Sequence, residues 1–284
     1  MEKMVMLPDG TAVSALGQGT WFLGEQAARA AEEKAALHSG IAAGMTLLDT
    51  AEMYGNGKAE RLLGEVIGDF RREDLFLVSK VYPHNAGRKH IFKSCQDSLE
   101  RLGTDYLDLY LLHWRGAVPL AETVTCMEEL VAEGKIRRWG VSNFDTEDME
   151  ELWTVPDGNR CAVNQVLYHV ASRGIEYDLL PWQARHRVPV MAYCPLAQAG
   201  ELKSGLYRNP VLNQIAGRHQ ATISQILLAW VIRGGHVTAI PRTGKALHAL
   251  ENARAAKITL TEEDLAMIDR AYPAPTGKVY LDIV

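Results

Sequence analysis

The chain has 284 residues, of which 47% are hydrophobic and 23% are charged, with 30 lysines and arginines against 35 aspartates and glutamates. This composition is typical of a packed globular protein and excludes a disordered chain. The formal charge of -5 and the lack of a long basic run argue against nucleic acid as a partner.

Four widely separated cysteines, at positions 95, 126, 161 and 194, include no C-x-x-C pair, which argues against a zinc knuckle or a dithiol redox motif. Scattered cysteines in a chain of this size suit a reducing compartment. The first residues, MEKMVMLPDG, lack the apolar segment of a signal peptide, and no stretch reaches the ~18 apolar residues of a membrane span. We therefore expect a cytoplasmic protein with no membrane contact.

In chain order, the first predicted element is a hairpin over residues 5–13 that turns at Asp9-Gly10. Eight short apolar runs follow at regular spacing. Nearly continuous apolar runs of this length are expected for parallel strands that are covered on both faces. They span residues 15–21, 46–51, 75–81, 107–113, 137–143, 161–168, 189–196 and 237–243.

Helical patterns lie between these runs and continue after the last one. Gly103 is a C-terminal stop, Pro119 a helix start and Asp145 an N-cap, and Thr261 with Asp264 resembles an acidic capping box. The predicted helices span residues 26–43, 58–70, 89–102, 120–132, 146–153, 175–187, 222–233, 245–256 and 261–271.

The alternation of strand and helix, repeated eight times, predicts an α/β fold: a (β/α)8 TIM barrel preceded by the hairpin. A doubly wound open sheet stays open as an alternative, because strand order cannot be read from one sequence. No linker or low-complexity tract divides the chain, so we expect residues 1–284 to form one domain. The polar tail, residues 273–284, is expected to wrap the surface or rim a site.

Polar residues stand where three consecutive apolar runs end. Asp49, Lys80 and His113 close the second, third and fourth runs, and Tyr54 lies five residues after Asp49. In a barrel, these strand ends open at the same mouth, where active sites lie. Each residue alone has an ordinary structural explanation, such as a cap, a surface lysine or a core histidine. The four together, on adjacent strand ends, favour an active site.

These four residue types make chemical sense together for a carbonyl that accepts hydride and then needs a proton. Tyr54 could give the proton, although a free phenol has a pKa of about 10. The Lys80 ammonium would favour the phenolate and lower that pKa, and Asp49 would pair with the buried ammonium. His113 could donate a hydrogen bond to the carbonyl oxygen. No metal is needed, and no metal-binding motif is present.

The run LDTAEMY, ending at Tyr54, resembles the signature of the aldo-keto reductase family. Lys80 in VSKV and His113 in LLHW match the other two members of that family's tetrad. The resemblance extends from about Ala15 to Tyr272, and the sequence is most similar to bacterial members that reduce methylglyoxal and related aldehydes. Further matches are Gly140-Val141-Ser142-Asn143-Phe144, Asn164-Gln165, Tyr193-Cys194-Pro195-Leu196, Ile240-Pro241-Arg242 and Glu251-Asn252.

The resemblance implies reduction of small aldehydes and ketones to alcohols, with NADPH as the cofactor. It makes Tyr54 the general acid, with Lys80 lowering its pKa, Asp49 holding Lys80 and His113 positioning the substrate. It also implies a cofactor site. Ser142, Asn143 and Gln165 would hold the nicotinamide carboxamide, Tyr193 would stack on the ring, and the remaining positions are Gly19, Thr20, Trp21, Asp49, Pro195, Leu196, Ile240 and Pro241.

The phosphate end of that cofactor is expected at Arg242, Thr243 and Lys245, between the last predicted strand and the following helix. A helix N-terminus with nearby cations is a ready phosphate site. Two positive charges would favour the 2′-phosphate of NADPH over NADH. By resemblance, Glu251 and Asn252 would contact the adenine.

One residue of this region departs from the family pattern. His248, also expected at the cofactor site, stands where many members carry arginine. A mostly neutral histidine lacks the guanidinium fork, so the preference for NADPH would be softer. Gly17, Gly19 and Gly24 are too widely spaced for a G-x-G-x-x-G motif, so the chain has no Rossmann fingerprint.

The substrate pocket is expected to be aromatic. Trp21, Tyr82 and Trp114 follow three predicted strands, and with Tyr54 and His113 they would surround the carbonyl. Aromatic walls favour compact or flat substrates. The loops and tail around this mouth look short for the family, which predicts an open pocket and broad specificity.

Two other interpretations remain open. The same barrel could be a sensor that binds NADPH tightly and turns over slowly, since fold does not fix function. It could also be an unrelated lyase or isomerase that uses Lys80 as a Schiff base. The even composition offers no clear interface patch, and we expect a monomer.

Overall fold

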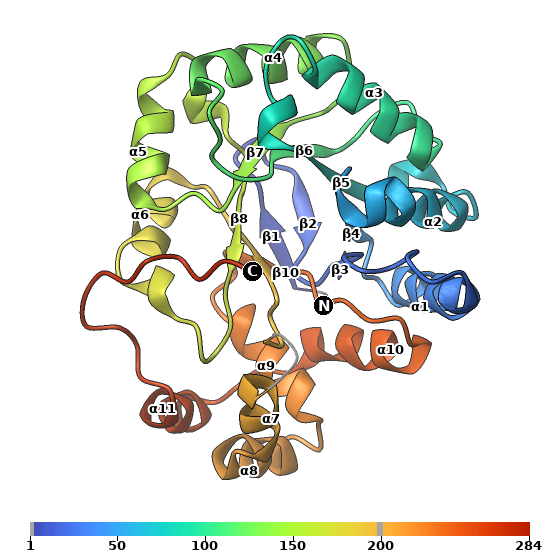
Figure 1. Cartoon of the computed structure of the whole chain (residues 1–284). Coiled ribbons are helices and arrows are strands. Elements are labelled where there is room, and N and C mark those ends of the chain that lie inside the picture. The colour runs from blue at the N-terminus through green and yellow to red at the C-terminus, as the bar shows by residue number, and fades with distance from the viewer. Residues whose placement is uncertain (1–2, 198–200) are drawn as a thin grey trace.

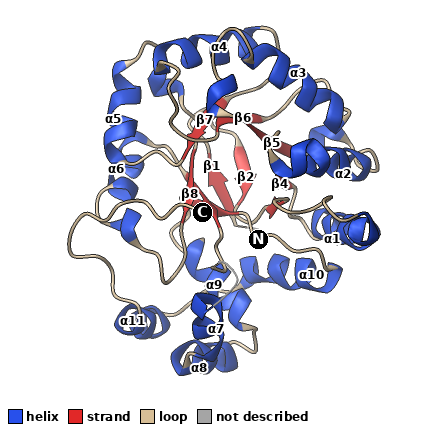
Figure 2. Ribbon diagram, in the orientation of Figure 1, coloured by secondary structure: helices blue, strands red, loops and turns tan. Residues whose placement is uncertain are grey.

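The computed structural model describes residues 3–197 and 201–284. Its centre is an eight-stranded parallel sheet, β10-β9-β8-β7-β6-β5-β4-β3, that is surrounded by helices (Figure 1, Figure 2). A parallel bridge between Leu16 and Ala239 joins the two end strands and closes the sheet. The predicted (β/α)8 barrel is therefore confirmed, and the open doubly wound sheet is excluded.

The strands lie where the apolar runs predict them. The hairpin pairs β1 (Met4–Met6) with β2 (Ala12–Ser14), and Asp9 in its turn accepts a hydrogen bond from Arg138, just before a barrel strand begins. The hairpin thus covers the N-terminal end of the barrel. The barrel strands are β3 (Gln18–Gly19), β4 (Leu47–Asp49), β5 (Phe76–Val81), β6 (Leu109–Leu112), β7 (Trp139–Ser142), β8 (Asn164–Leu167), β9 (Val190–Tyr193) and β10 (Val237–Ala239).

Most helices also match the predictions. Asp145 with Asp148, and Thr261 with Asp264, form the two capping boxes. Two helices between β9 and β10, α7 and α8, were not predicted. The helices are α1 (Ala30–Ala42), α2 (Lys58–Ile67), α3 (Ile91–Leu102), α4 (Leu120–Ala132), α5 (Thr146–Thr154), α6 (Leu179–His186), α7 (Glu201–Arg208), α8 (Pro210–Arg218), α9 (Ile223–Val231), α10 (Ala246–Arg254) and α11 (Glu262–Ala271).

The alternation of side chains along β5 decides which of its residues reach the site. Ser79 donates a hydrogen bond of 2.7 Å to Glu60 of α2, so it points outward to the helical layer. Its neighbour Lys80 therefore points into the barrel, because successive side chains of a strand face opposite sides. The register pairs Val78 with Asp49, which brings the inward carboxylate and ammonium together near the C-terminal ends of the strands.

The C-terminal tail crosses the mouth of the barrel, and Figure 1 shows the chain end near its centre. Lys278 forms an ion pair of 2.7 Å with Glu147, and Asp282 accepts a hydrogen bond from Ser172. The backbone of the last residue, Val284, lies close enough to Tyr193 at the end of β9 to affect the pKa of the Tyr193 hydroxyl. The tail thus rims the mouth, as one of the two expectations for it stated.

Packing inside the barrel wall leaves no room for a side chain at Gly140 of β7. A Cβ atom at this position would lie 2.5 Å from the Val163 carbonyl oxygen and 2.9 Å from a Leu111 methyl group. At Gly217, an exposed position in α8, a Cβ atom would meet nothing within 4 Å. Substitution of Gly217 by alanine is therefore a suitable control for the same substitution at Gly140.

We expect Gly140→Ala to lower the free energy of unfolding by about 1–3 kcal/mol, because rigid backbone cannot move away from the methyl group. Gly217→Ala should leave it unchanged or raise it by up to ~1 kcal/mol, because alanine reduces the entropy of the unfolded chain. Urea denaturation of both variants measures the two effects. Equal effects of the two substitutions would contradict the packing at Gly140.

Candidate active site

Lys80 lies at the centre of a hydrogen-bonded group at the mouth of the barrel. Its Nζ atom is 2.7 Å from Asp49 Oδ1, 2.9 Å from the Thr50 carbonyl oxygen and 3.0 Å from the Tyr54 hydroxyl. Lys80 is 0% exposed and Asp49 is 2% exposed. Three of the four residues expected at the strand ends are thus in direct contact.

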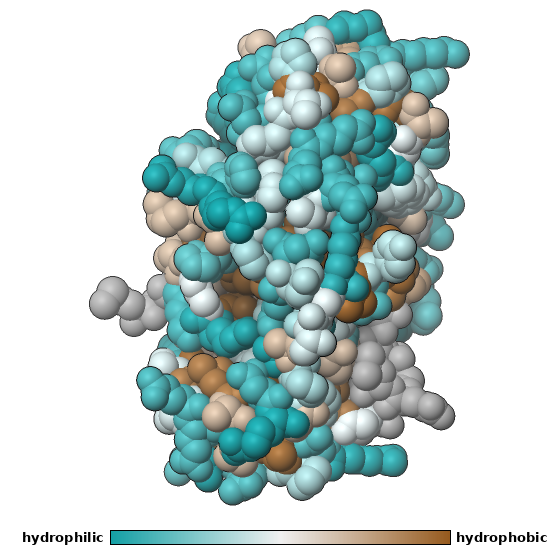
Figure 3. All heavy atoms as spheres, turned by 90° about the vertical axis from the view of Figure 1, so that its left-hand side faces the viewer, coloured by the Kyte–Doolittle hydropathy of each residue, from teal (hydrophilic) through white to brown (hydrophobic). Residues whose placement is uncertain are grey.

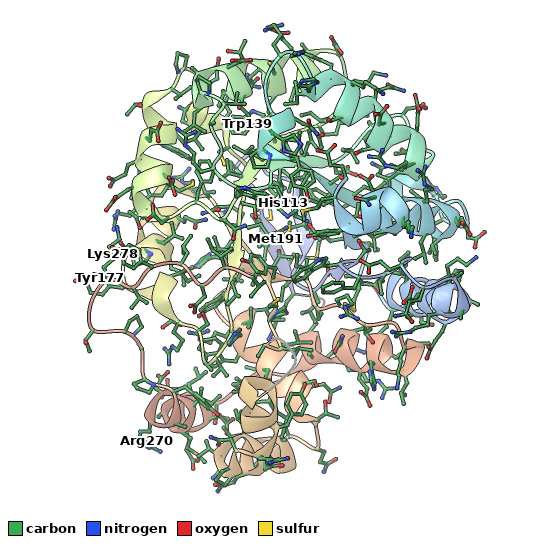
Figure 4. The ribbon with its side chains drawn as sticks, in the orientation of Figure 1. His113, Trp139, Tyr177, Met191, Arg270 and Lys278 are labelled. Atoms are coloured by element: carbon green, nitrogen blue, oxygen red, sulfur yellow. The ribbon has the colours of Figure 1, made fainter. Side chains whose placement is uncertain are left out.

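His113 completes the group from the end of β6. Its ring lies 5.8 Å from the Tyr54 ring at an interplanar angle of 74°, and 4.9 Å from the Trp114 ring. Figure 4 shows His113 in the middle of the barrel. The Nδ1 atom of His113 is buried and has no hydrogen-bond partner within residues 3–197 and 201–284. The four candidate catalytic residues therefore converge, as the strand ends predict.

Burial works against both charges of the Asp49–Lys80 pair. It raises the pKa of Asp49 and lowers the pKa of Lys80, and their mutual attraction opposes both shifts. Gln165 of β8 donates a hydrogen bond of 2.8 Å to Asp49 Oδ2, so both carboxylate oxygens have a donor. Such added hydrogen bonds are what a buried ion pair needs to persist.

The pKa of Tyr54 shifts opposite to our expectation. Burial raises it well above its usual value, and the negative charge of Asp49 and the nearby Cys194 add to the rise. We expected the Lys80 ammonium to lower this pKa, but burial of the phenol is the largest effect and the Asp49 charge acts in the same direction. The phenol is therefore protonated at neutral pH and available as a proton donor, with the ammonium 3.0 Å from its oxygen to receive a developing phenolate.

His113 is also neutral. Burial, with a smaller effect of the Lys80 ammonium, lowers the pKa of His113 to about 2. Its ring can thus offer a hydrogen bond to a substrate oxygen without carrying a charge, while Tyr54 remains the group able to release a proton.

The residues expected to hold a nicotinamide carboxamide form a second group beside the first. Asn143 donates a hydrogen bond of 3.2 Å to the His113 carbonyl oxygen and accepts one of 2.8 Å from the Tyr193 hydroxyl. The Ser142 hydroxyl donates to the Gln165 carbonyl oxygen at 2.9 Å. Asn143 has a φ of 59°, a left-handed conformation that asparagine tolerates. The structure thus brings these four residues together next to Asp49.

The residues expected at the phosphate end lie where the barrel closes. Gly19 donates a hydrogen bond of 3.1 Å to the Pro241 carbonyl oxygen, and a Cβ atom at Gly19 would lie 3.0 Å from the Ile240 carbonyl oxygen. The next turn leads into α10 with exposed Arg242 and Lys245. Also in or next to these loops are Thr20, Thr243, Pro195, Leu196, His248, Glu251 and the buried Asn252.

This turn fits an anionic group. Lys245 is the N-cap of α10 and provides no side-chain cap, so the first backbone N–H groups of the helix are open. Neither Arg242 nor Lys245 has a carboxylate partner within the described part of the chain. Uncommitted cations at an open helix N-terminus are the donor set that a phosphate needs.

The aromatic side chains form a continuous wall. Trp21 lies 6.3 Å from the Tyr54 ring and stacks on Phe22 at 4.4 Å. On the other side of His113, Trp114 meets Tyr82 edge-on at 5.4 Å. The predicted aromatics Trp21, Tyr82 and Trp114 are thus connected through ring contacts to Tyr54 and His113.

Two residues of this wall and its support escaped the sequence analysis. Phe22 extends the wall to Arg242, whose guanidinium lies 5.7 Å from its ring. Glu52 accepts hydrogen bonds from the Tyr82 backbone N–H at 2.6 Å and from Asn85 at 3.1 Å, so it holds the loop that carries Tyr82. An acidic residue between Asp49 and Tyr54 was the available signal, although its partners are remote in sequence.

Within residues 3–197 and 201–284, no group of three or more histidine, cysteine or carboxylate side chains could hold a metal ion. No helix in the same ranges is long and apolar enough to cross a membrane.

The barrel, and the hydrogen-bonded Asp49, Tyr54 and Lys80 beside His113, can be compared with known proteins. The family model of the aldo/keto reductase family matches residues 15–273. The chain belongs to the aldo/keto reductase family. It is 55% identical to methylglyoxal reductase YeaE of Escherichia coli K12 (100% of this chain, 99% of that protein) and 35% identical to glyoxal reductase of Bacillus subtilis 168 (95% and 92%).

Among solved structures, it is similar to an aldo/keto reductase from Klebsiella pneumoniae in complex with NADP and acetate. The TM-score is 0.97, the identity is 55%, and 100% of each chain is covered. A structure of an aldo-keto reductase from the same organism in complex with NADPH gives the same values. The resemblance inferred from the motifs is thus confirmed.

The low pKa of His113 can be tested directly by an NMR titration. We expect NMR of ¹⁵N-histidine-labelled protein to show a neutral His113 imidazole from about pH 4 to 9, because burial opposes protonation. In the urea-unfolded chain, the same residue should titrate near ~6.5. In Lys80→Met, the pKa of His113 should rise only slightly, because burial is the larger cause. Titration near neutral pH in the folded protein would contradict the buried geometry.

Proposed function

We propose that this protein reduces small aldehydes and ketones, such as methylglyoxal, to alcohols with NADPH. The observation that carries the proposal is the 3.0 Å contact between the Lys80 ammonium and the Tyr54 hydroxyl, in a site rimmed by aromatic rings. Support also comes from the relative named methylglyoxal reductase and from the neighbours with NADP and NADPH.

In the proposed reaction, the bound cofactor supplies hydride to the carbonyl carbon. Tyr54 gives its proton to the carbonyl oxygen, so carbon and oxygen together gain the two hydrogens of the alcohol. Lys80 stabilises the phenolate that remains, and Asp49 fixes Lys80 in place. Neutral His113 orients the carbonyl oxygen by a hydrogen bond. The raised pKa of Tyr54 keeps the donor protonated before each turnover.

We assign the cofactor contacts as the resemblance implies. Ser142, Asn143 and Gln165 would hold the nicotinamide carboxamide, and Tyr193 would stack on the ring. The open turn before α10 takes the phosphate end. The other contacts are Gly19, Thr20, Trp21, Asp49, Pro195, Leu196, Ile240, Pro241, Arg242, Thr243, His248, Glu251 and Asn252.

The Schiff-base alternative does not fit the contacts of Lys80. An amine that attacks a carbonyl must be unprotonated and reachable, yet Lys80 is 0% exposed and surrounded by three oxygen partners. The sensor alternative makes no use of a protonated phenol beside an ammonium. The enclosed Lys80 and the protonated Tyr54 beside it both favour a reductase in which Tyr54 donates the proton.

We further propose that residues 1–284 act as one domain and as a monomer with an open, broad-specificity pocket. On the face seen in Figure 3, hydrophobic residues lie as small separate areas among hydrophilic ones, unlike the apolar patch of a stable dimer. Cys95, Cys126 and Cys161 are buried thiols, which supports a location in the reducing cytoplasm.

Tyr54→Phe tests the proton donor. We expect wild type to consume NADPH with methylglyoxal and with 4-nitrobenzaldehyde, and the variant to lose ~10²–10⁴-fold in kcat, because general acid catalysis is removed. NADPH binding, followed by protein fluorescence, should persist. The matched control is Tyr177→Phe, a half-exposed tyrosine on the outside of the barrel (Figure 4). A wild type that binds NADPH but reduces neither aldehyde would move the assignment to a sensor.

A further inference from the structure

Arg29 lies against the turn that we assign to the cofactor phosphate, although it comes from the other end of the chain. It ends the short 3-10 turn before α1, and α1 packs beside α10 (Figure 1). Its Nη2 atom is 3.2 Å from where a Cβ atom of Gly244 would be. The guanidinium therefore fills the space into which a side chain at Gly244 would project.

The hydrogen-bonding capacity of Arg29 is largely unused. Its ionic partner is Glu33, at 3.8 Å, which is longer than a direct hydrogen bond. The guanidinium makes no hydrogen bond to another residue in the described ranges, and the side chain is 42% exposed. A guanidinium with free N–H groups is well suited to bind phosphate oxygens.

Glu33 is the acidic group nearest to this guanidinium. It is 2% exposed, and its Oε2 atom accepts a hydrogen bond of 2.9 Å from the Gly24 backbone N–H. Its Oε1 atom faces Arg29. Glu33 lies beside the same turn, because its Cγ and Oε1 atoms are 3.2 and 3.8 Å from where a Cβ atom of Gly244 would be. Its carboxylate therefore offsets part of the positive charge there, while Arg29 stays accessible.

Arg29 lies near Gly244 in space, and Arg242 and Lys245 lie within two residues of it in sequence. Arg29 comes from the α1 side, and Arg242 and Lys245 come from the α10 side. Within residues 3–197 and 201–284, Arg29 has the long ion pair of 3.8 Å with Glu33, and neither Arg242 nor Lys245 has a carboxylate partner. Clustered like charges repel one another, and a multiply charged anion relieves that repulsion.

We propose that Arg29 is a further specificity-determining residue, which binds the 2′-phosphate of NADPH from the α1 side. The proposal rests on the proposed function, because it concerns the same cofactor site. Arg29 would supply a guanidinium to a site in which position 248 is histidine, which has none. NADH, which lacks the 2′-phosphate, gains nothing from Arg29.

Binding to the cofactor-free protein tests this role without turnover. We would measure 2′,5′-ADP, 5′-AMP and inorganic phosphate by calorimetry, and NADPH and NADH by protein fluorescence. In Arg29→Gln, the Kd for NADPH and for 2′,5′-ADP should rise about tenfold, as expected for loss of a charge-assisted hydrogen bond. The Kd for NADH and for 5′-AMP should change less than ~2-fold. Arg254→Gln, at the far end of α10, is the matched control and should change nothing.

Two results would overturn the proposal: an unchanged affinity for NADPH in Arg29→Gln, or an equal loss for NADPH and NADH, which would make Arg29 only a support for the loop. If Arg29→Gln does not fold, Arg29→Lys keeps the charge without the fork and should weaken 2′,5′-ADP about threefold. Phosphate alone binding as tightly as 2′,5′-ADP would also overturn it, by assigning the cluster to a free anion. A wild type that binds neither dinucleotide would instead refute the proposed function.

Discussion

The buried ammonium of Lys80 is the constraint around which the barrel mouth is built. A charged amine with no exposed surface is costly unless oxygens surround it, and Asp49, Thr50 and Tyr54 supply them. All three oxygens come from the end of β4 and the loop that follows it. Gln165, from β8 on the opposite side of the barrel, satisfies the other oxygen of Asp49, so the arrangement also requires a closed barrel.

Burial of the pair serves the site more than the stability of the fold. Apolar residues of similar size often replace buried ion pairs without loss of stability. Inside the mouth, however, an ammonium acts at lower dielectric and on a fixed hydroxyl. The same burial raises the pKa of Tyr54 and lowers that of His113. Two neutral groups that can donate hydrogen bonds therefore stand beside one fixed, compensated charge.

The sequence was informative wherever one local rule decided the structure. Apolar runs located every barrel strand because those strands are covered on both faces, and the polar residues that ended them marked the site. The pKa of Tyr54 could not be predicted, because its sign depends on burial depth and on how far Asp49 offsets Lys80. Helices α7 and α8 were missed because they add to the strand–helix repeat. The support by Glu52 depends on partners about thirty residues away.

The proposed phosphate site of Arg29, Arg242 and Lys245 could not be predicted from the sequence alone. It exists only where the two ends of the barrel sheet meet. The Gly19 N–H of β3 donates a hydrogen bond to the Pro241 carbonyl oxygen after β10, and one turn further out Arg29 lies beside Gly244. Cations more than two hundred residues apart become neighbours only when the barrel closes. A ligand held by both sides of this seam binds the closed barrel and not the open chain. By linkage, it must therefore stabilise the closure that also holds Gln165 against Asp49.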